Sequence, residues 1–357
     1  MKNSDISRLR IVNQHLYHTK FKTISEVIKW FGAIQAQEYA HAKWAIGMRL
    51  QDINNSIIED AFTRGELLRT HALRPTWHFV SNEDIRWIIA LTAPRVKAVN
   101  AFMYRKMELT DTLLNKTTDI LAKELEGGKH LTRTTLNEAL AKKKIIADGI
   151  RLSCIMMQAE LNGVICSGPR MGKQFTYALL DERVPPTPII SNDEALANLA
   201  KQYFLSRGPA SIKDFSTWSG LTISDSKKGL EMIKSHLTKE IIEGEEYYFK
   251  PDTSFTEKTK ELFLLPVYDE YIMGYKNRIA MLDVKNTYSP ATPFVFDNTI
   301  IFEGQIIGTW KRTIQKTCID FNYSFFTPPD KEYTRLLKKA IEKYEQFHAL
   351  PVNIQIR

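Results

Sequence analysis

The segment 192–250 constrains the fold of this chain most, because its helix starts and stops are marked in the sequence. Ser191-Asn-Asp-Glu194 has the spacing of a capping box, and both Arg207-Gly-Pro209 and Gly220 are typical helix ends. After the last helix, runs of Ile, Tyr and Phe flank a glycine, as in two strands joined by a turn. The sequence therefore predicts three helices followed by a hairpin, at 192–207, 211–220, 224–237 and 241–249.

The same order of elements recurs twice before this segment, with weaker signals. In the nearer segment, helical patterns at 113–126, 132–143 and 152–161 precede strand-like runs at 164–166 and 175–179. In the segment upstream of it, helical patterns at 24–34 and 56–64 precede a strand-like run at 73–80. Three helices followed by a hairpin is the layout of a winged helix, a helix-turn-helix with a β-wing. We therefore expect an α+β fold with tandem winged-helix modules at 1–110, 111–185 and 190–255.

Beyond residue 255 the pattern changes to alternating strands. Glu303-Gly304 is a hairpin signal, and a helix expected at 330–348 has one apolar face. Strand composition is found at 262–267, 294–296, 299–302, 305–310 and 317–321. The sequence thus predicts a small C-terminal α+β domain at 256–357, a β-meander or partial barrel with a terminal helix.

The positive charge of the chain is uneven. The net charge is +8, and residues 1–50 hold eight Lys and Arg against three acids, while residues 95–144 hold eleven against six. Clustered positive charge favours a polyanionic partner, because contacts with phosphates release condensed counterions. This excess is modest, so a basic protein with no such partner remains an alternative until motifs are considered.

Other sequence features limit the compartment and the chemistry. No 18-residue apolar run and no signal-peptide pattern is present. Three cysteines without metal-like spacing make a disulfide framework or a metal centre unexpected. The sequence also lacks a phosphate-binding loop, a serine-hydrolase elbow, a zinc-protease motif and a dinucleotide fingerprint. We expect a soluble, reduced, cytoplasmic protein without a cofactor.

Gln35-Ala36-Gln37 is the likeliest place for chemistry, because no acid–base catalytic set is found elsewhere. Residues at i and i+2 lie about 200° apart around a helix but on the same face of an extended segment. Both glutamines therefore line one site only if the preceding helix ends near Ile34. The alternative is that both are solvated or capping residues, since glutamine is mostly exposed in proteins.

Several ordered segments give the chain its resemblance to a known family: 34–38, 73–78, 168–170, 176–183, 207–210, 218–221, 265–278 and 308–310. Together they resemble the winged-helix DNA-binding family that includes the AlkZ/YcaQ-type DNA glycosylases. The resemblance implies excision of alkylated bases, including unhooking of interstrand crosslinks. Gln35 and Gln37 are similar to the catalytic Gln-x-Gln of the AlkZ-type branch. Pro75 departs from the family pattern, because that pattern has a small residue such as glycine at this position.

Two amides are adequate for such a substrate. An N7-alkylated purine is already cationic, so it leaves without a general acid. A glutamine carbonyl can hold and orient a water molecule, and its NH₂ can donate a hydrogen bond. Proximity and orientation are then the main contributions, and normal purines should resist.

Other side chains are candidates for contact with DNA or the lesion. The predicted DNA-contacting residues are His41, Lys43, Arg49, Arg74, His78, Arg170 and Lys173. Asp269 and Arg278 form a second tier near the sugar, although a structural ion pair is the favoured interpretation of Asp269. A lone histidine in an apolar strand, such as His78, is more often a hydrogen-bonded core residue. Lys227, Lys228, Lys234 and His236 suit phosphates rather than base edges, which favours backbone- and shape-directed binding.

The leading hypothesis is a monofunctional glycosylase for N7-alkylpurines, because no lysine is identifiable that would form a Schiff base. Its expected partner is duplex DNA with alkylation lesions, and the protein is expected to be monomeric, without metal or membrane, and associated with a bacterial nucleoid. The alternative is a non-catalytic winged-helix protein, regulatory or architectural. That alternative predicts sharp sequence preference and no effect of changing the glutamines.

Overall fold

The computed structural model describes residues 2–17, 19–254, 260–282 and 296–355. The first unit surrounds a three-stranded sheet of order β1-β3-β2. Its strands are β1 (Ile34–Gln35), β2 (Leu67–Ala72) and β3 (Thr76–Ser81). Its helices are α1 (Asn3–Asn13), α2 (Ile24–Phe31), α3 (Tyr39–Gly47), α4 (Asn55–Arg64) and α5 (Ile85–Lys106).

The second unit has three helices and a sheet of order β4-β6-β5. Its helices are α6 (Asp111–Leu125), α7 (Arg133–Lys142), α8 (Gly149–Leu161) and the short α9 (Leu180–Arg183). Its strands are β4 (Leu131–Thr132), β5 (Ile165–Ser167) and β6 (Thr176–Leu179). The predicted helices and the two predicted strands are all present in this unit, each shifted by a few residues at its ends.

The third unit has the predicted order of elements. It contains α10 (Asn192–Arg207), α11 (Ile212–Ser219), α12 (Ile223–Ile233) and the hairpin β7 (Thr238–Ile242) and β8 (Glu245–Phe249), with a 3-10 turn at Lys234–His236 before the hairpin. The helix starts follow their caps: the Ser191 side chain accepts from the Glu194 backbone, and Ser211 and Asp214 form a complete capping box.

The C-terminal unit is a five-stranded sheet with one long helix. The strand order is β13-β12-β11-β10-β9, antiparallel except where β13 pairs with β12. The elements are β9 (Leu262–Leu265), α13 (Glu270–Met273), a 3-10 turn (Ile279–Met281), β10 (Asn298–Phe302), β11 (Gln305–Ile314), β12 (Ile319–Phe325), α14 (Lys331–His348) and β13 (Val352–Ile354). The hairpin at Glu303-Gly304 is confirmed, while β13 is missing from the sequence prediction. Residues 294 and 295 of the strand expected at 294–296 lie outside the described residues.

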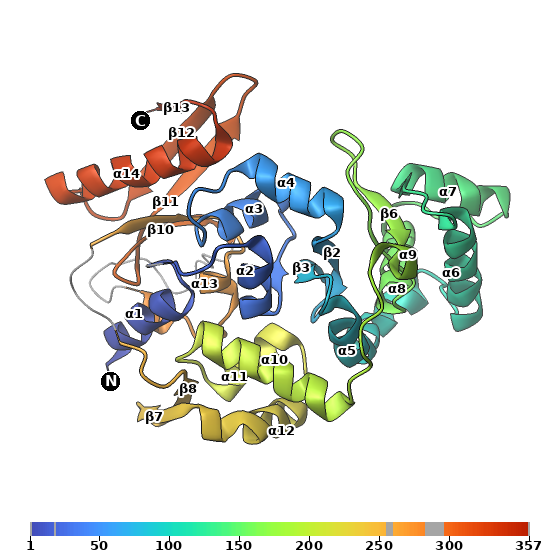
Figure 1. Ribbon diagram of the computed structural model, residues 1–357, viewed down its shortest axis with the longest axis horizontal. Helices are drawn as coiled ribbons and strands as arrows, with labels where there is room; N and C mark the ends of the chain where they lie inside the picture. The colour runs from blue at the N-terminus through green and yellow to red at the C-terminus, as the bar shows by residue number, and fades with distance from the viewer. Residues whose placement is uncertain (1, 18, 255–259, 283–295, 356–357) are drawn as a thin grey trace.

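These units share one hydrophobic core. Buried apolar side chains form a continuous cluster from α1 through the three small sheets to α14. The Trp44 ring on α3 packs against Tyr344 and Phe347 of α14, at 4.9 and 5.1 Å between ring centroids. In Figure 1, α2 and α3 lie near the middle of the molecule, with α10–α12 below, α6–α8 to the right and α14 above on the left. The N-terminal segment carrying the glutamines is therefore enclosed by chain from distant parts of the sequence.

One predicted strand begins later than expected, and the strand before it was not predicted. The sequence pattern indicated a single strand at 73–80, whereas β2 ends at Ala72 and β3 begins at Thr76. Leu73 has φ 59°, in the left-handed region, so the chain turns sharply through Leu73-Arg74-Pro75. This turn contacts the end of α11, because a Cβ on Gly220 would lie 2.2 Å from the Leu73 carbonyl oxygen.

We predict that Gly220→Ala destabilises the protein much more than Gly244→Ala. Both glycines have positive φ, 71° and 81°, so both substitutions carry the left-handed backbone cost of about 1 kcal/mol. Only Gly220 also meets a backbone oxygen, whereas no atom lies within 4 Å of a Cβ at Gly244. Urea unfolding should show a loss of about 2 kcal/mol or more for the first variant and about 1 kcal/mol for the second. Equal losses would contradict the close contact.

Candidate active site

The two glutamines lie on extended chain. Helix α2 ends at Phe31, and Gly32 with φ 72° turns the chain into β1. Gln35 pairs with His78 of β3, and the Ala36 amide donates to the Trp77 carbonyl at 2.7 Å. Gln37 follows before α3 begins at Tyr39. The geometric condition for both glutamines to share a face, that the helix ends before them, is satisfied.

Arg74 and His78 surround the Gln35 side chain. Gln35 is only 5% exposed, and its Oε1 accepts from Arg74 Nη2 at 2.7 Å. The same Nη2 lies 3.4 Å from Nε2 of His78, whose Nδ1 lies 2.9 Å from the Thr76 carbonyl oxygen. Arg74 Nη1 donates to the carbonyl of Trp218 at the end of α11. Burial, followed by the Arg74 charge, lowers the pKa of His78 well below its usual value, so His78 is neutral.

A buried carboxylate fixes the backbone of Gln35. Glu270 is fully buried, and its Oε1 accepts from the Gln35 amide at 2.8 Å. Its Oε2 accepts from Arg207 Nη2 at 2.6 Å, from Arg207 Nε at 3.0 Å and from Trp218 Nε1 at 2.9 Å. Arg207 also donates to the carbonyls of Phe31 and Ala33 at 2.9 and 2.8 Å, and to Ser206 Oγ. All five guanidinium donors are therefore used, and two of them hold the exit of α2.

Sequence reasoning missed these anchoring residues. Arg207 and Trp218 lie in segments that carry the family resemblance, and Glu270 follows Asp269, but their sequence separation from Gln35 gives no sign of contact. A buried charge pair is visible only once the fold brings its members together. The one available signal was the acidic pair Asp269-Glu270 at the start of the short helix α13.

Gln37 has a different environment from Gln35. Its side chain is exposed, and its Oε1 lies 3.4 Å from the Trp77 amide, at the outer limit of a hydrogen bond. Its backbone carbonyl accepts from Arg69 Nη2 at 3.3 Å, and Arg69 Nε donates to the Ala36 carbonyl at 2.9 Å. The Arg69 guanidinium lies 4.3 Å from the Trp77 ring centroid. The backbone of the motif is thus held, while the Gln37 side chain is free to turn.

The predicted DNA contact by Arg49 is wrong. Arg49 is fully buried and forms a two-pronged ion pair with Asp269, at 2.8 and 2.9 Å, and its other donors bind oxygens of Gln14 and Ala45. A charge that is enclosed and neutralised in this way cannot reach a phosphate. The structural ion pair favoured for Asp269 is confirmed, although its partner is Arg49. Arg278, half-buried, donates from Nε to the Ile272 carbonyl at 2.9 Å, and it forms no ion pair with Asp269 in the described part of the chain.

Lys43 and His78 also need correction as DNA contacts. Lys43 is 5% exposed and pairs with Glu59 at 2.6 Å, and His78 is fully buried with both ring nitrogens facing protein groups. Arg170 is half-buried and pairs with the same Glu59 at 3.3 Å. His41 is partly buried near Trp310, and burial lowers its pKa to about 4. Of the seven predicted contacts, Lys173 alone is exposed.

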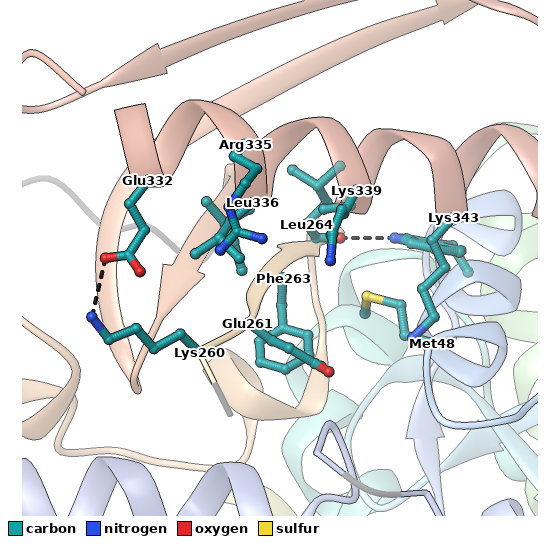
Figure 2. Close-up of a pocket in the computed structure, with 13 residues that line it drawn as sticks. Met48, Lys260, Glu261, Phe263, Leu264, Glu332, Arg335, Leu336, Lys339 and Lys343 are labelled. Carbon is teal, nitrogen blue, oxygen red and sulfur yellow. Dashed lines mark hydrogen bonds and ion pairs between the residues drawn. The ribbon is translucent and has the colours of Figure 1, made fainter. Parts of the chain in front are cut away.

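Two hollows differ in their relation to the motif. One of about 410 Å³ is lined by Arg69, Trp77, Phe175 and the exposed Lys173, among others, and adjoins Gln37 because Arg69 and Trp77 both contact it. The other, of about 510 Å³, runs along α14 and contains the cationic side chains Lys260, Arg335, Lys339 and Lys343, with Lys260 paired to Glu332 at 3.1 Å (Figure 2). The second hollow contains none of the predicted site residues, so the candidate site remains at β1.

Within 2–17, 19–254, 260–282 and 296–355, no three His, Cys, Asp or Glu side chains form a group that would hold a metal ion. No helix in that part of the chain is long and apolar enough to cross a membrane.

Comparison with known proteins identifies the family. The sequence model described as "DNA glycosylase AlkZ-like" matches residues 28–347. The chain belongs to the AlkZ-like DNA glycosylase family. The fold is similar to that of the Streptomyces sahachiroi DNA glycosylase AlkZ, with a TM-score of 0.78 and 19% identity, over 99% of this chain and 100% of that one. No curated protein sequence matches the chain.

Membership in the AlkZ-like family makes the protein a DNA glycosylase and supports the main hypothesis over the regulatory alternative. Among the described residues, the two buried carboxylates near β1, Glu270 and Asp269, are both engaged by arginines. The functional groups found around the motif in the described residues are the two glutamine amides and the hydrogen-bonded guanidinium groups of Arg69, Arg74 and Arg207.

We predict that Glu270→Gln lowers the free energy of unfolding by about 3 kcal/mol or more, because it leaves the Arg207 charge buried without a counter-charge. Asp181→Asn is the control, since it breaks a pair with Arg86 in which the aspartate is 84% exposed. That loss should be under about 1 kcal/mol. Denaturant titration measures both, and a loss for Glu270→Gln no larger than the control's would contradict the anchoring role.

Proposed function

We propose that this glycosylase hydrolyses the N-glycosidic bond of N7-alkylpurines in duplex DNA, with Gln35 and Gln37 as the catalytic residues. The observation that carries this proposal is the engagement of Glu270 and Asp269, the two buried carboxylates beside the motif. Glu270 binds Arg207, Trp218 and the Gln35 backbone, and Asp269 binds Arg49. Glu38, next to Gln37, is exposed and hydrogen-bonds to neither glutamine within the described residues, so no carboxylic acid is held against the motif and the proposed substrate carries its own activation.

A cationic N7-alkylpurine meets that requirement. Its C1′–N9 bond breaks with the electron pair returning to a positively charged ring, so the base leaves neutral without a proton. The site then has to place a water molecule and hold the lesion, which amides can do. Normal purines leave as poor anions and should be resistant. Crosslinks through purine N7 have the same activated bond, and we include them in the proposed substrate class.

The three N-terminal units are proposed to bind the duplex as winged-helix modules. In the third unit, α10, α11, α12 and the β7–β8 hairpin have the order of a winged helix. Exposed cations such as Lys173 and Lys227 are the proposed backbone contacts, because Lys43 and Arg49 are enclosed in ion pairs. Such contacts give affinity that falls with salt and varies little with sequence. The protein is proposed to act as a monomer.

We predict that the purified protein releases free base from a duplex containing N7-methylguanine and leaves an abasic site without strand cleavage. No lysine hydrogen-bonds to Gln35 or Gln37 within the described residues, so borohydride should trap no covalent complex. Gln37→Ala should slow release by roughly 10- to 1000-fold in single-turnover assays. Lys316→Ala, at an exposed position of the C-terminal unit between β11 and β12, is the control and should excise at the wild-type rate.

Two outcomes would contradict the proposal. Release no faster than spontaneous depurination across several alkyl groups removes the activity on these lesions. Selection from random duplexes that yields a sharp sequence motif, together with unchanged binding by the glutamine variants, supports a regulatory DNA-binding protein.

A further inference from the structure

The contact with Arg74 determines the orientation of the Gln35 amide. A guanidinium group has only hydrogen-bond donors, so the atom 2.7 Å from Arg74 Nη2 must be the acceptor Oε1. The NH₂ group of Gln35 therefore points away from Arg74. Its Nε2 makes no hydrogen bond to any residue in the described ranges. The free hydrogen-bonding group that Gln35 offers is a donor.

The neighbours of Arg74 hold that orientation. The Thr76 carbonyl accepts from His78, so Nδ1 of the neutral imidazole carries the proton and Nε2 is the acceptor that faces Arg74. The Trp218 carbonyl accepts from the other terminal nitrogen of Arg74. Arg74 therefore lies among acceptors on all three contacts. Turning the Gln35 amide over would bring its NH₂ against a group that only donates.

Gln37 has no such constraint. No side-chain donor among the described residues holds its Oε1, and the Trp77 amide lies 3.4 Å away. The side chain is exposed, so it can turn and offer its carbonyl oxygen to water. The two amides of the motif therefore differ in what they can present to a ligand.

We propose that the two glutamines have separate roles, and that Arg74 is the positioning residue that separates them. Gln35 donates its NH₂ to an acceptor on the leaving purine, and Gln37 accepts from the attacking water. This inference rests on the proposed function and deepens it. As the C1′–N9 bond breaks, its electron pair moves onto the base, where the Gln35 donor is best placed. The water oxygen bonds to C1′, and its proton passes to solvent.

Glutamate substitutions distinguish a donor from an acceptor at each position. Gln35→Glu keeps an oxygen for Arg74 and removes the NH₂, so single-turnover release of N7-methylguanine should fall about 100-fold. Gln37→Glu is the matched comparison, because a carboxylate still accepts from water. Its loss of rate should be much smaller than that of Gln35→Glu. Retention of activity by Gln35→Glu, or an equal loss in Gln37→Glu, overturns the assignment.

The role of Arg74 is tested by rescue and by coupling. Arg74→Met removes the donor and should lower the single-turnover rate about tenfold or more, with a smaller change in lesion affinity. Arg74→Lys restores a donor and should recover most of the rate. In the Gln35→Ala background, Arg74→Met should have little further effect, because Arg74 acts through Gln35. Additive losses, or no recovery by lysine, overturn the positioning role.

Stability measurements test the orientation without any enzyme activity. If Arg74 faces Oε1, Gln35→Glu forms an ion pair and should melt no lower than the wild type at pH 7. In the Gln35→Glu background, Arg74→Met leaves the new carboxylate unpaired. It should therefore lower the melting temperature by several degrees more in that background than it does in the wild type. A wild type that excises no lesion would overturn the proposed function while this ordering still stands. A Gln35→Glu variant that melts far below the wild type would overturn the orientation itself.

Discussion

The carboxylate of Glu270 is the interaction on which the position of the candidate site depends. It comes from the C-terminal unit, binds Arg207 from the third unit, and accepts from the backbone of Gln35 in the first. Taking two charges out of water is costly, and the cost is offset only when all their hydrogen bonds are made. Here all five Arg207 donors and both Glu270 oxygens are used. The arrangement tolerates little displacement of β1, which gives a two-residue strand a defined place.

Two consecutive acidic residues, Asp269 and Glu270, bind arginines from different parts of the chain. Asp269 binds Arg49, which follows α3, and Glu270 binds Arg207 at the end of α10. The start of α13 is therefore joined to the chain after the glutamine motif through Arg49 and to the chain before it through Arg207. All four side chains are buried. Removing the C-terminal unit would leave Arg49 and Arg207 enclosed without counter-charges. The C-terminal sheet is therefore part of the site's support, although none of its strands carries a proposed catalytic residue.

The sequence predicted local structure well because helix caps and apolar periodicity are local signals. The helix expected after Ser191 begins there and is capped by the Ser191 side chain, and the requirement that the chain be extended at Gln35 is met. The prediction failed where tertiary contacts decide. The turn at Leu73 needs positive φ against Gly220, and composition alone does not reveal that contact. Arg49 and Lys43 were predicted to contact DNA because of their charge. Arg49 instead pairs with Asp269, 220 residues away, and Lys43 pairs with Glu59, 16 residues away.

The positive charges of Arg69 and Arg74 beside the motif are a reason to expect DNA, rather than a free nucleoside, as the substrate. Glu270 neutralises Arg207, but Arg69 and Arg74 have no carboxylate partner among the described residues. Burial lowers the pKa of each to about 10, so both remain charged at neutral pH. Two such charges oppose the approach of a cationic purine on its own. A lesion within a duplex brings flanking phosphates, whose negative charge offsets the arginines and makes the encounter favourable. The same arginines that hold the motif in place would thus make the site discriminate against small cationic bases.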